Sequence, residues 1–586
     1  MPLIAFLLLA GIRQTDMTPR PQLTTRWTAS VNPEAPHQEY PRPQFRRKNW
    51  VNLNGRWDFA ISPTLERPSR FASKIVVPFP VESYLSGVQR RVPDGASVWY
   101  RRSFTPPKGD RLLLNFEASD WDTTVWVNGV QVGNHQGGYD PFSFDITDAL
   151  KGRGQQELVV RVIDPTDAGP QPRGKQVRRP RSIWYAPTTG IWGTVWLEPV
   201  PASNVYRLRI IARNAGDVDV LVDVHEGQPP HSLPLTVQIE GSAPQSVGVG
   251  SDTSVGLGRA QFKIANPELW SPEHPRLYKL KVTYGEDVVA SYFAFREVSV
   301  GRGPDGKTRL LLNGKPYFMI GPLDQGFWPD GLYTAPTEAA MRYDLDMTKK
   351  LGFNLVRKHV KVEPRTWYAY CDRIGLLVWQ DMPSGDGYIG TQDPDLKRTP
   401  ESAAIFEKEL AAMIETHFNS PCIVTWVLFN EGWGQYDTVR LARWVKERDP
   451  SRLLDATTGW SDRGVGDMHD VHQYPGPSSQ APEAHRAAVL GEFGGLGLPT
   501  PGHMWQEKAW GYQSFKTRAE LTTRFEEILA KLTDLIATPG CSAGVYTQTT
   551  DVETEANGLM TYDRAVLKMD PRRVRGAIEK LTAGNK

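Results

Sequence analysis

The sequence predicts a multidomain protein with two β-sandwiches followed by a (β/α)8 barrel, and three observations predict this order. The chain of 586 residues is far longer than one hydrophobic core requires, since domains typically hold about 100–200 residues. Between residues 50 and 300, short β runs alternate with turn signals and show no helical period, which is typical of sandwiches. After residue 301, strands alternate with helices, which indicates parallel β/α units.

Residues 1–45 are interpreted as a leader or a signal region. The part from 13 to 45 is rich in Pro and Arg and lacks periodicity, so we expect it to be mobile. The apolar run at 3–10 is too short to span a bilayer but suits the apolar centre of a secretory signal. No Lys or Arg precedes this run and no clear cleavage site follows it. Localisation therefore stays open, with a periplasmic or secreted protein slightly favoured over a cytoplasmic one.

Residues 46–200 are predicted to form the first sandwich. The segment 97–104 (SVWYRRSF) reads as a short β run. The segment 124–132 (TVWVNGVQV) reads as two strands joined by Asn128-Gly129, the strongest short-range hairpin signal. Several such strands without helical periodicity predict a sandwich here.

Residues 201–300 continue the strand pattern. Runs at 206–211, 217–224, 235–240 and 277–282 are separated by turn signals. About 100 residues with strands at this spacing fit an immunoglobulin-like sandwich. The Cys-Trp-Cys signature of antibody domains is absent, so this assignment depends on the pattern alone.

Residues 301–586 are predicted to form the barrel. A strand at 317–320 precedes a helix at 337–351, which Gly352 ends, and the next strand lies at 354–357. The remaining predicted strands lie at 376–380, 423–429, 453–456, 470–474, 489–491 and 544–548. Eight strands in a segment of this length match the size of a (β/α)8 barrel.

Two glutamates end apolar runs in this region. Glu431 ends 423–431 (IVTWVLFNE), and Glu492 ends 488–492 (AVLGE). Residues just past the carboxyl ends of barrel strands face the active site, and two carboxylates there are the minimum needed to cleave a glycosidic bond. A lone glutamate after a strand also serves as a helix cap or surface group. The Gly-Trp-Gly that follows Glu431 favours the functional interpretation, because Trp433 offers a flat face for a sugar.

Composition excludes several classes of partner. The net charge of +2 indicates no polyanionic partner. The basic run 173–181 (RGKQVRRPR) contains Pro and Gly and lacks aromatic residues, so it is interpreted as a solvated loop rather than a nucleic-acid site. We expect no membrane partner. The cysteines Cys371, Cys422 and Cys541 are odd in number and sparse, which predicts neither a disulfide framework nor a zinc site.

One segment has the composition of a metal site. It contains Asp467, His469, Asp470 and His472. However, strand alternation places the two histidines on opposite faces. We therefore predict no metal and no cofactor.

Longer motifs resemble family 2 glycoside hydrolases, which include β-galactosidases, β-glucuronidases and β-mannosidases. Segments 52–59 (NLNGRWDF), 137–142 (GGYDPF) and 189–198 (TGIWGTVWLE) are similar to the family's sugar-binding jelly roll. Segment 419–431 (NSPCIVTWVLFNE) is similar to its acid/base signature. The resemblance covers nearly all of residues 46–586 and implies that the first sandwich is a jelly roll.

The resemblance also implies a mechanism. Glu431 maps to the acid/base and Glu492 to the nucleophile of a retaining, double-displacement reaction. Asn430, Arg357 and Tyr474 fall where the family places hydrogen-bond donors, and Asn430 would bind the 2-hydroxyl of the sugar. No cofactor is implied.

Further residues carry roles with open alternatives. Arg357 could serve only to neutralise a buried acid, and Tyr474 could belong to the core. Trp433 is expected to form a sugar platform. The resemblance implies that His359 replaces the histidine that family members usually carry after the second strand. Asp120 aligns roughly with a loop that reaches the active site from the first domain.

Departures from the family pattern leave the sugar open. No Asn-x-Lys pair follows Glu492, which counts against a β-glucuronidase, and 546–553 (YTQTTDVE) lacks the usual Trp. We expect a retaining exo-β-glycosidase acting on a carbohydrate, most similar to a β-galactosidase. The alternatives are an enzyme for arabinose-type or uronic sugars, or an inert carbohydrate-binding protein. The presence of both glutamates counts against inertness, and a homo-oligomer stays open.

Overall fold

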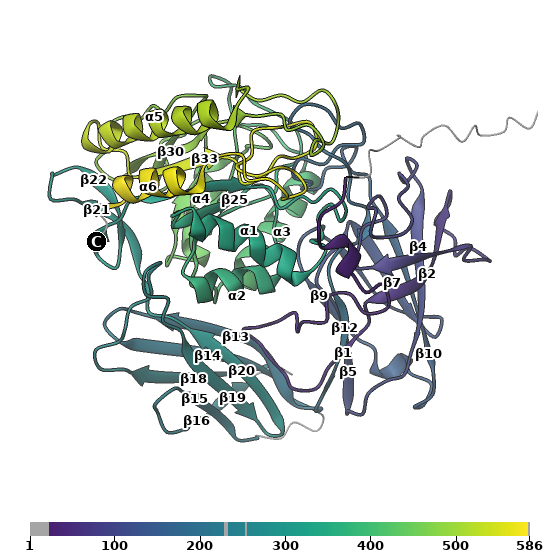
Figure 1. The fold of residues 1–586 in the computed structure, drawn as a ribbon. Helices are drawn as coiled ribbons and strands as arrows, with labels where there is room; N and C mark the ends of the chain where they lie inside the picture. The colour runs from purple at the N-terminus through teal and green to yellow at the C-terminus, as the bar shows by residue number, and fades with distance from the viewer. Residues whose placement is uncertain (1–22, 228–232, 252–254, 584–586) are drawn as a thin grey trace, which may run out of the picture.

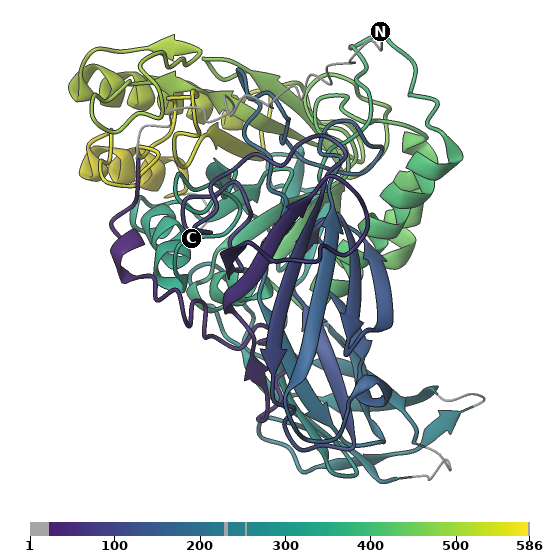
Figure 2. The same cartoon turned by 90° about the vertical axis from the view of Figure 1, so that its right-hand side faces the viewer.

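The computed structural model describes residues 23–227, 233–251 and 255–583. Figure 1 shows three parts: a β-sandwich at the right, a second sandwich below, and a barrel with its surrounding helices above. Figure 2 shows the first sandwich extending along both the barrel and the second sandwich. The order of folds is the predicted one. Within the described ranges, no helix is both long and apolar enough to cross a membrane.

The first sandwich is a jelly roll with two main antiparallel sheets. The larger sheet contains, in order, β3 (Ser73–Val77), β2 (Gly55–Ser62), β4 (Ser97–Phe104), β10 (Gln156–Ile163), β7 (Asp122–Val127) and β8 (Val130–Gln136). The smaller contains β1 (Val51–Asn52), β12 (Val195–Val200), β5 (Arg111–Phe116) and β9 (Phe142–Asp145). As predicted, β7 and β8 meet at Asn128-Gly129, where both residues have positive φ (52° and 85°).

The second sandwich packs two four-stranded antiparallel sheets. One contains β13 (Asn204–Ala212), β14 (Asp217–His225), β18 (Val255–Lys263) and β17 (Val249–Ser251). The other contains β16 (Gln245–Val247), β15 (Leu235–Ile239), β19 (Tyr278–Tyr284) and β20 (Asp287–Phe293). Alternate residues such as Val220, Val237 and Val282 point inward and are fully buried, which is the period-2 pattern of a half-buried strand.

Eight parallel strands form the barrel sheet. Their order is β28 (Leu453–Asp455), β27 (Ile423–Val427), β26 (Leu377–Asp381), β25 (Leu355–Lys358), β24 (Met319–Asp324), β33 (Ala543–Thr547), β30 (Ala487–Gly494) and β29 (Met468–Gln473). Asp467 joins the two end strands: its N–H donates to the Leu454 carbonyl (2.7 Å), and its Oδ2 accepts from the Leu454 N–H (2.7 Å). Asp467 therefore closes the barrel, and its carboxylate has a structural role.

Helices surround the barrel. They are α1 (Glu338–Lys350), α2 (Arg365–Ile374), α3 (Pro400–His417), α4 (Thr438–Arg448), α5 (Arg518–Ala537) and α6 (Pro571–Leu581). The helix predicted at 337–351 is α1, and the side chain of its N-cap residue Thr337 accepts from the Ala340 N–H. A capping box of Thr517 and Glu520 begins α5.

Shorter elements complete the fold. They are η1 (Thr28–Ser30), η2 (Thr147–Ala149), β6 (Ser119–Asp120), β11 (Gly190–Ile191), β21 (Val298–Arg302), β22 (Thr308–Leu312), β23 (Lys315–Pro316), β31 (Leu496–Gly497) and β32 (Gln513–Ser514).

Polar contacts with α2 and α3 attach both sandwiches to the barrel. Tyr292 of the second sandwich donates to Asp372 Oδ2 of α2 (2.7 Å). Trp121 of the first sandwich donates through Nε1 to Glu409 Oε1 of α3 (3.1 Å). Because Asp372 and Glu409 are buried, these hydrogen bonds satisfy polar groups that would otherwise destabilise the interface.

The expectation of a mobile leader is wrong for its described part, residues 23–45. Thr25 donates to Asp330 Oδ2 of the barrel (3.0 Å from N, 2.7 Å from Oγ1), and the Trp27 ring lies 5.2 Å from that of Tyr343. Tyr40 donates to Glu198 (2.8 Å). These partners are far away in sequence, so composition could not show them. The apolar run at 3–10 lies outside the described residues, and a signal there stays a prediction.

The interpretation of the basic run as a solvated loop is also wrong in part. It belongs to residues 171–189, which cross from β10 toward the barrel and are here called the bridging segment. The N–H groups of Arg173 and Gly174 both donate to the Ser384 carbonyl of the barrel (2.8 and 2.9 Å). Gln176 is buried and donates to Asp120 Oδ2 (3.0 Å). Only the end of the run, from Arg179 to Arg181, is exposed.

Candidate active site

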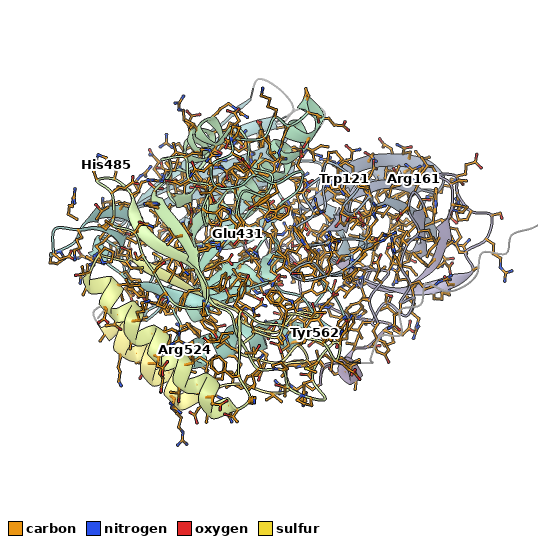
Figure 3. All side chains as sticks on the ribbon, turned by 90° about the horizontal axis from the view of Figure 1, so that it is seen from above. Trp121, Arg161, Glu431, His485, Arg524 and Tyr562 are labelled. Atoms are coloured by element: carbon orange, nitrogen blue, oxygen red, sulfur yellow. The ribbon has the colours of Figure 1, made fainter. Side chains whose placement is uncertain are left out.

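Glu431 lies near the centre of the molecule, in the barrel, with the first sandwich that carries Trp121 and Arg161 to one side (Figure 3). It follows the end of β27 by four residues, so it lies at the carboxyl end of the barrel, as predicted. Its backbone has a left-handed φ of 53°, and its N–H donates to the Thr458 carbonyl (3.2 Å). This hydrogen bond fixes a conformation that a non-glycine residue rarely adopts.

Glu492 lies inside β30 rather than after it, because the strand continues to Gly494. The pairing of β30 with both neighbouring strands shifts register near this residue. Against β29 the shift lies between Val471 and His472 of β29, and against β33 it lies between Leu490 and Phe493 of β30. Such irregularities turn a side chain away from the regular alternation of a strand. The strand therefore presents Glu492 to the barrel mouth before it ends.

The two glutamates meet across the barrel mouth, with His472 of β29 between them. One carboxylate oxygen of Glu431, one of Glu492 and a ring nitrogen of His472 lie within 4.8 Å of one another. His472 Nδ1 is 2.8 Å from Glu431 Oε1 and 3.7 Å from Glu492 Oε2. The sequence-based expectation that both carboxylates reach one site thus agrees with the geometry.

Glu492 is buried and held by two donors. Arg357 Nη1 lies 3.3 Å from its Oε1, and the Tyr474 hydroxyl donates to its Oε2 (2.5 Å). Burial raises the pKa of Glu492, but nearby positive charges, of which that of His472 is the largest, outweigh burial and lower the pKa to about 2. The carboxylate is therefore ionised at neutral pH.

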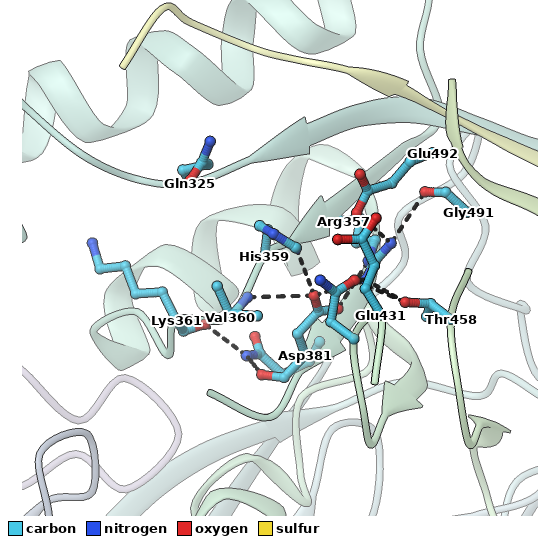
Figure 4. Close-up of polar contacts among 12 residues, drawn as sticks. Gln325, Arg357, His359, Val360, Lys361, Asp381, Glu431, Thr458, Gly491 and Glu492 are labelled. Carbon is cyan, nitrogen blue, oxygen red and sulfur yellow. Dashed lines mark hydrogen bonds and ion pairs between the residues drawn. The ribbon is translucent and has the colours of Figure 1, made fainter. Parts of the chain in front are cut away.

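Arg357 of β25 organises the base of the site (Figure 4). It is fully buried, and its Nε and Nη2 donate to the two oxygens of Asp381 (3.0 Å each). Its Nη2 also donates to Asn430 Oδ1 (2.9 Å). Arg357 therefore pairs with the buried Asp381 and also contacts Glu492, and its role in catalysis stays a prediction.

Asn430 presents its amide nitrogen to the site. Its Oδ1 accepts hydrogen bonds from Arg357 and from Thr458 Oγ1 (2.8 Å), which fixes the orientation of the amide. Within the described part of the chain, Nδ2 makes no hydrogen bond. It is therefore a free donor beside Glu431.

Tyr474 is anchored on two sides. Its ring stacks on that of Tyr512 with the centroids 3.7 Å apart and the planes 3° apart, and its hydroxyl lies 2.8 Å from Thr547 Oγ1. Burial, followed by the charge of Glu492, raises the pKa of Tyr474 well above its usual value. Tyr474 therefore remains a phenol that donates to Glu492.

The other predicted residues lie at three different places. His359 Nδ1 is 2.9 Å from Asp381 Oδ2, and burial lowers the pKa of His359 well below its usual value. The Trp433 ring lies 4.8 Å from the rings of both Tyr388 and Trp184. Asp120 contacts none of these groups; it is buried in the first sandwich and accepts from Gln176 of the bridging segment.

Three family models match the chain in the same order as its three folds. The sugar binding domain of glycosyl hydrolases family 2 matches residues 64–170, the model described as glycosyl hydrolases family 2 matches 205–296, and the TIM barrel domain of that family matches 306–475. The chain belongs to glycosyl hydrolase family 2. This membership confirms the fold class predicted from the sequence.

Individual curated proteins are similar to this chain over parts of their length. A β-galactosidase of Thermoanaerobacter pseudethanolicus is 29% identical over 361 residues, which are 58% of this chain and 45% of that protein. The chain spans less than half the length of this and other curated relatives.

Two solved structures share the fold of this chain. A β-galacturonidase from Eisenbergiella tayi bound to galacturonate has a TM-score of 0.68 at 20% identity, covering 93% of this chain and 99% of that one. A β-glucuronidase of Bifidobacterium dentium complexed with coumarin-3-O-glucuronide has a TM-score of 0.71 at 18% identity, covering 92% and 98%.

Sequence reasoning missed three residues of the candidate site. His472 contacts Glu431, Asp381 holds Arg357, and Tyr512 stacks on Tyr474. One signal could have identified His472: it is two residues before Tyr474 in a predicted strand, so both side chains point to the same face. No comparable signal exists for Tyr512, which follows a long loop.

The segment that resembled a metal site is divided by the strand, as alternation predicted. His472 faces the two glutamates, whereas His469 lies near Asp462 and Glu483. Asp462 and Glu483 both pair with Arg486 (2.7 and 2.5 Å), so a cation already binds both carboxylates of that second group. The first group consists of His472 and the two candidate catalytic residues, Glu431 and Glu492.

Proposed function

We propose that this chain is a retaining exo-β-glycosidase that hydrolyses terminal β-linked sugars by double displacement. One observation carries the proposal: one carboxylate oxygen of Glu431 and one of Glu492 lie within 4.8 Å of each other. Retaining enzymes hold their carboxyl groups about 5–5.5 Å apart, whereas inverting enzymes need about 6.5–9.5 Å to admit a water molecule. The separation favours attack on the sugar by the carboxylate itself.

In the first step, Glu492 attacks the anomeric carbon while Glu431 donates its proton to the glycosidic oxygen. The bond between the anomeric carbon and that oxygen breaks, the aglycone leaves as an alcohol, and an ester joins the sugar to Glu492. In the second step, Glu431 removes a proton from water, the water oxygen attacks the same carbon, and the ester bond breaks. Both carboxyl groups return to their starting states.

The surrounding residues support these roles. The pKa of Glu492, lowered to about 2 as described above, keeps the nucleophile ionised. Arg357 and Tyr474 each donate to one of its two oxygens, which fixes the orientation of the carboxylate. The free amide nitrogen of Asn430 suits the sugar 2-hydroxyl, where hydrogen bonds strengthen in the transition state. The aromatic face of Trp433 suits a sugar ring.

The bridging segment supports an exo mode of action. Its Trp184 ring lies 4.8 Å from Trp433, and the N–H of its Ala186 donates to Glu553 Oε1 (3.0 Å). These contacts place the segment on one side of the barrel mouth. A site closed on one side accepts a chain end more readily than the middle of a polysaccharide.

For the sugar, two candidates follow from the chain and its relatives. The sequence favours a neutral β-galactoside, and β-galactosidases are among the similar proteins. A uronic sugar is the second candidate, and the Eisenbergiella tayi structure contains galacturonate. An arabinose-type sugar gains no specific support from the geometry, and an inert protein would not need the donors that hold Glu492.

A panel of nitrophenyl β-glycosides tests the activity, and proton NMR of the first product tests the stereochemistry. We expect hydrolysis of at least one β-glycoside, with the β-anomer of the free sugar appearing before mutarotation. Glu431→Gln and Glu492→Gln should each abolish most of the turnover. Appearance of the α-anomer first, or full activity in either variant, would contradict the proposal.

A further inference from the structure

The bridging segment carries two half-buried cations, Arg173 and Lys175, that pair with no carboxylate among the described residues. Within the described ranges, Lys175 Nζ makes no hydrogen bond and no ion pair. The Arg173 guanidinium pairs with no carboxylate either, and its Nε is buried without a partner. Both side chains are only half exposed. A cation partly removed from water without a partner is destabilising, so such a group indicates a site for an anion.

The backbone around Lys175 is fixed by both domains. Gly174 has a φ of 61°, and a Cβ added to it would lie 2.5 Å from the Val360 carbonyl oxygen and 2.9 Å from the Tyr333 hydroxyl. The Lys175 carbonyl accepts from the Tyr185 N–H (3.1 Å). Lys175 is thus held at the contact between the first sandwich and the loop that follows β25, the strand of Arg357.

The charge of Lys175 reaches the base of the candidate active site. Burial lowers the pKa of His359, and the charge of Lys175 is the next largest cause. Burial raises the pKa of Glu555, and the charge of Lys175 is the largest influence that opposes it. The same charge is among those that counter burial at Glu492. Lys175 therefore acts on the side of the site where the nucleophile lies.

The carboxylates nearby have donors of their own. Glu555 accepts from Asn557 Nδ2 (2.9 Å), and Glu492 is held by Arg357 and Tyr474. These pairings leave the ammonium group of Lys175 available for a ligand.

Lys361 provides a contrast. Its ammonium group is fully buried and donates to the Gly326 carbonyl (2.7 Å), the Tyr333 carbonyl (2.9 Å) and Glu363 Oε1 (2.9 Å). A lysine used only for structure in this protein thus has all three of its donors satisfied. Lys175 differs in having none of them satisfied.

We infer that Lys175 binds the carboxylate of a terminal β-uronosyl residue in the site of Glu431 and Glu492. The inference rests on the proposed glycosidase function and names its substrate class. An ammonium group on the nucleophile's side suits a singly charged group carried by the sugar that Glu492 attacks. The cation comes from the first sandwich, which explains how a uronide could be recognised without an Asn-x-Lys pair after Glu492.

Matched substrates with a neutral nitrophenyl aglycone place the only carboxylate on the attacked sugar. The pairs are β-glucuronide with β-glucoside and β-galacturonide with β-galactoside. We expect one uronide to have a kcat/KM about 100-fold or more above its neutral partner, because truncating or omitting one member of a desolvated charge pair costs roughly that much. Lys175→Met should lower this ratio about 100-fold. Arg179→Met, which removes an exposed cation of the same run, should leave the ratio unchanged.

A binding measurement keeps the inference testable without turnover. Titration calorimetry of the protein with D-glucuronate and D-galacturonate should give binding of one acid, lost in Lys175→Met and retained in Arg179→Met. Thermal unfolding of both variants should match the parent protein, which excludes a folding defect.

Several outcomes would overturn the inference. One is a neutral glycoside hydrolysed as well as, or better than, its uronide. Another is an equal loss on both substrates in Lys175→Met, which would mean that the ammonium serves only Glu492. Absence of binding to either acid would also overturn it. Release of the α-anomer first would instead refute the retaining function and leave the uronate-binding result to stand separately.

Discussion

His472 Nδ1 lies 2.8 Å from Glu431 Oε1, so a ring on β29 contacts the carboxylate that follows β27. The same nitrogen is 3.7 Å from Glu492 Oε2, and the other ring nitrogen is 3.8 Å from the buried Asp470. His472 therefore connects the two carboxylates of the proposed mechanism. It orients Glu431 and also lies close to Glu492.

His472→Asn should lower kcat/KM about 100-fold, because a displaced Glu431 delivers its proton poorly. It should also raise the pKa of Glu492, since His472 is the largest of the charges that counter burial there. The acid limb of the kcat/KM profile should then move to higher pH. His469→Asn is the matched control, because that ring faces Glu483 (3.4 Å) instead. A pH profile of kcat/KM that His472→Asn leaves unchanged would contradict a role of His472 in the proposed mechanism.

Glu431→Ala should slow the glycosylation step according to the leaving group. An alkyl glycoside, which needs protonation, should lose roughly 1,000-fold, whereas a dinitrophenyl glycoside should lose far less. Pre-steady-state kinetics of the two substrates measure that step. Equal losses on both would assign Glu431 a structural role.

Glu492→Gly should abolish turnover, because no other group can attack the anomeric carbon. The vacated space should admit azide, which attacks from the face that Glu492 occupied. Cleavage of an activated β-glycoside should then resume and give the α-glycosyl azide, identified by NMR. Formation of the β-azide, or turnover without an added anion, would remove Glu492 from the nucleophile role.

Tyr474→Phe should lower kcat about 10- to 100-fold, because the ring and its stacking on Tyr512 remain while the donor to Glu492 Oε2 is lost. With one donor fewer, the pKa of Glu492 should rise, and the acid limb should move upward. Steady-state kinetics across pH and a thermal melt measure both effects. A lower melting temperature with unchanged kcat would place Tyr474 in the core only.

Chelation should leave activity intact, since the two-carboxylate mechanism needs no metal. Assays after prolonged dialysis against EDTA test this expectation. A large loss that Mg²⁺ or Zn²⁺ restores would mean that a metal binds at Glu431, His472 and Glu492 or at Asp462, His469 and Glu483.

Much of the fold could be predicted from local signals in the sequence. The hairpin at Asn128-Gly129 follows from two residues that tolerate positive φ, and Thr337 and Gly352 bound α1 as cap and stop signals do. All eight barrel strands were predicted, because buried parallel strands are continuous apolar runs between helices. Glu431 and Glu492 could be identified as candidate site residues for the same reason, because each ends or interrupts such an apolar run.

What only the tertiary structure decided is which distant groups meet. The packing of residues 23–45 on the barrel, the contact of His472 with Glu431, and the contact of the bridging segment with Ser384 join segments far apart in the chain. The basic run looked solvated because its composition is that of a loop, yet its backbone donors bind Ser384. Periodicity and capping report only neighbours along one helix or strand. Contacts between domains depend on how the surfaces of the folded domains pack together, and no local sequence pattern encodes this packing.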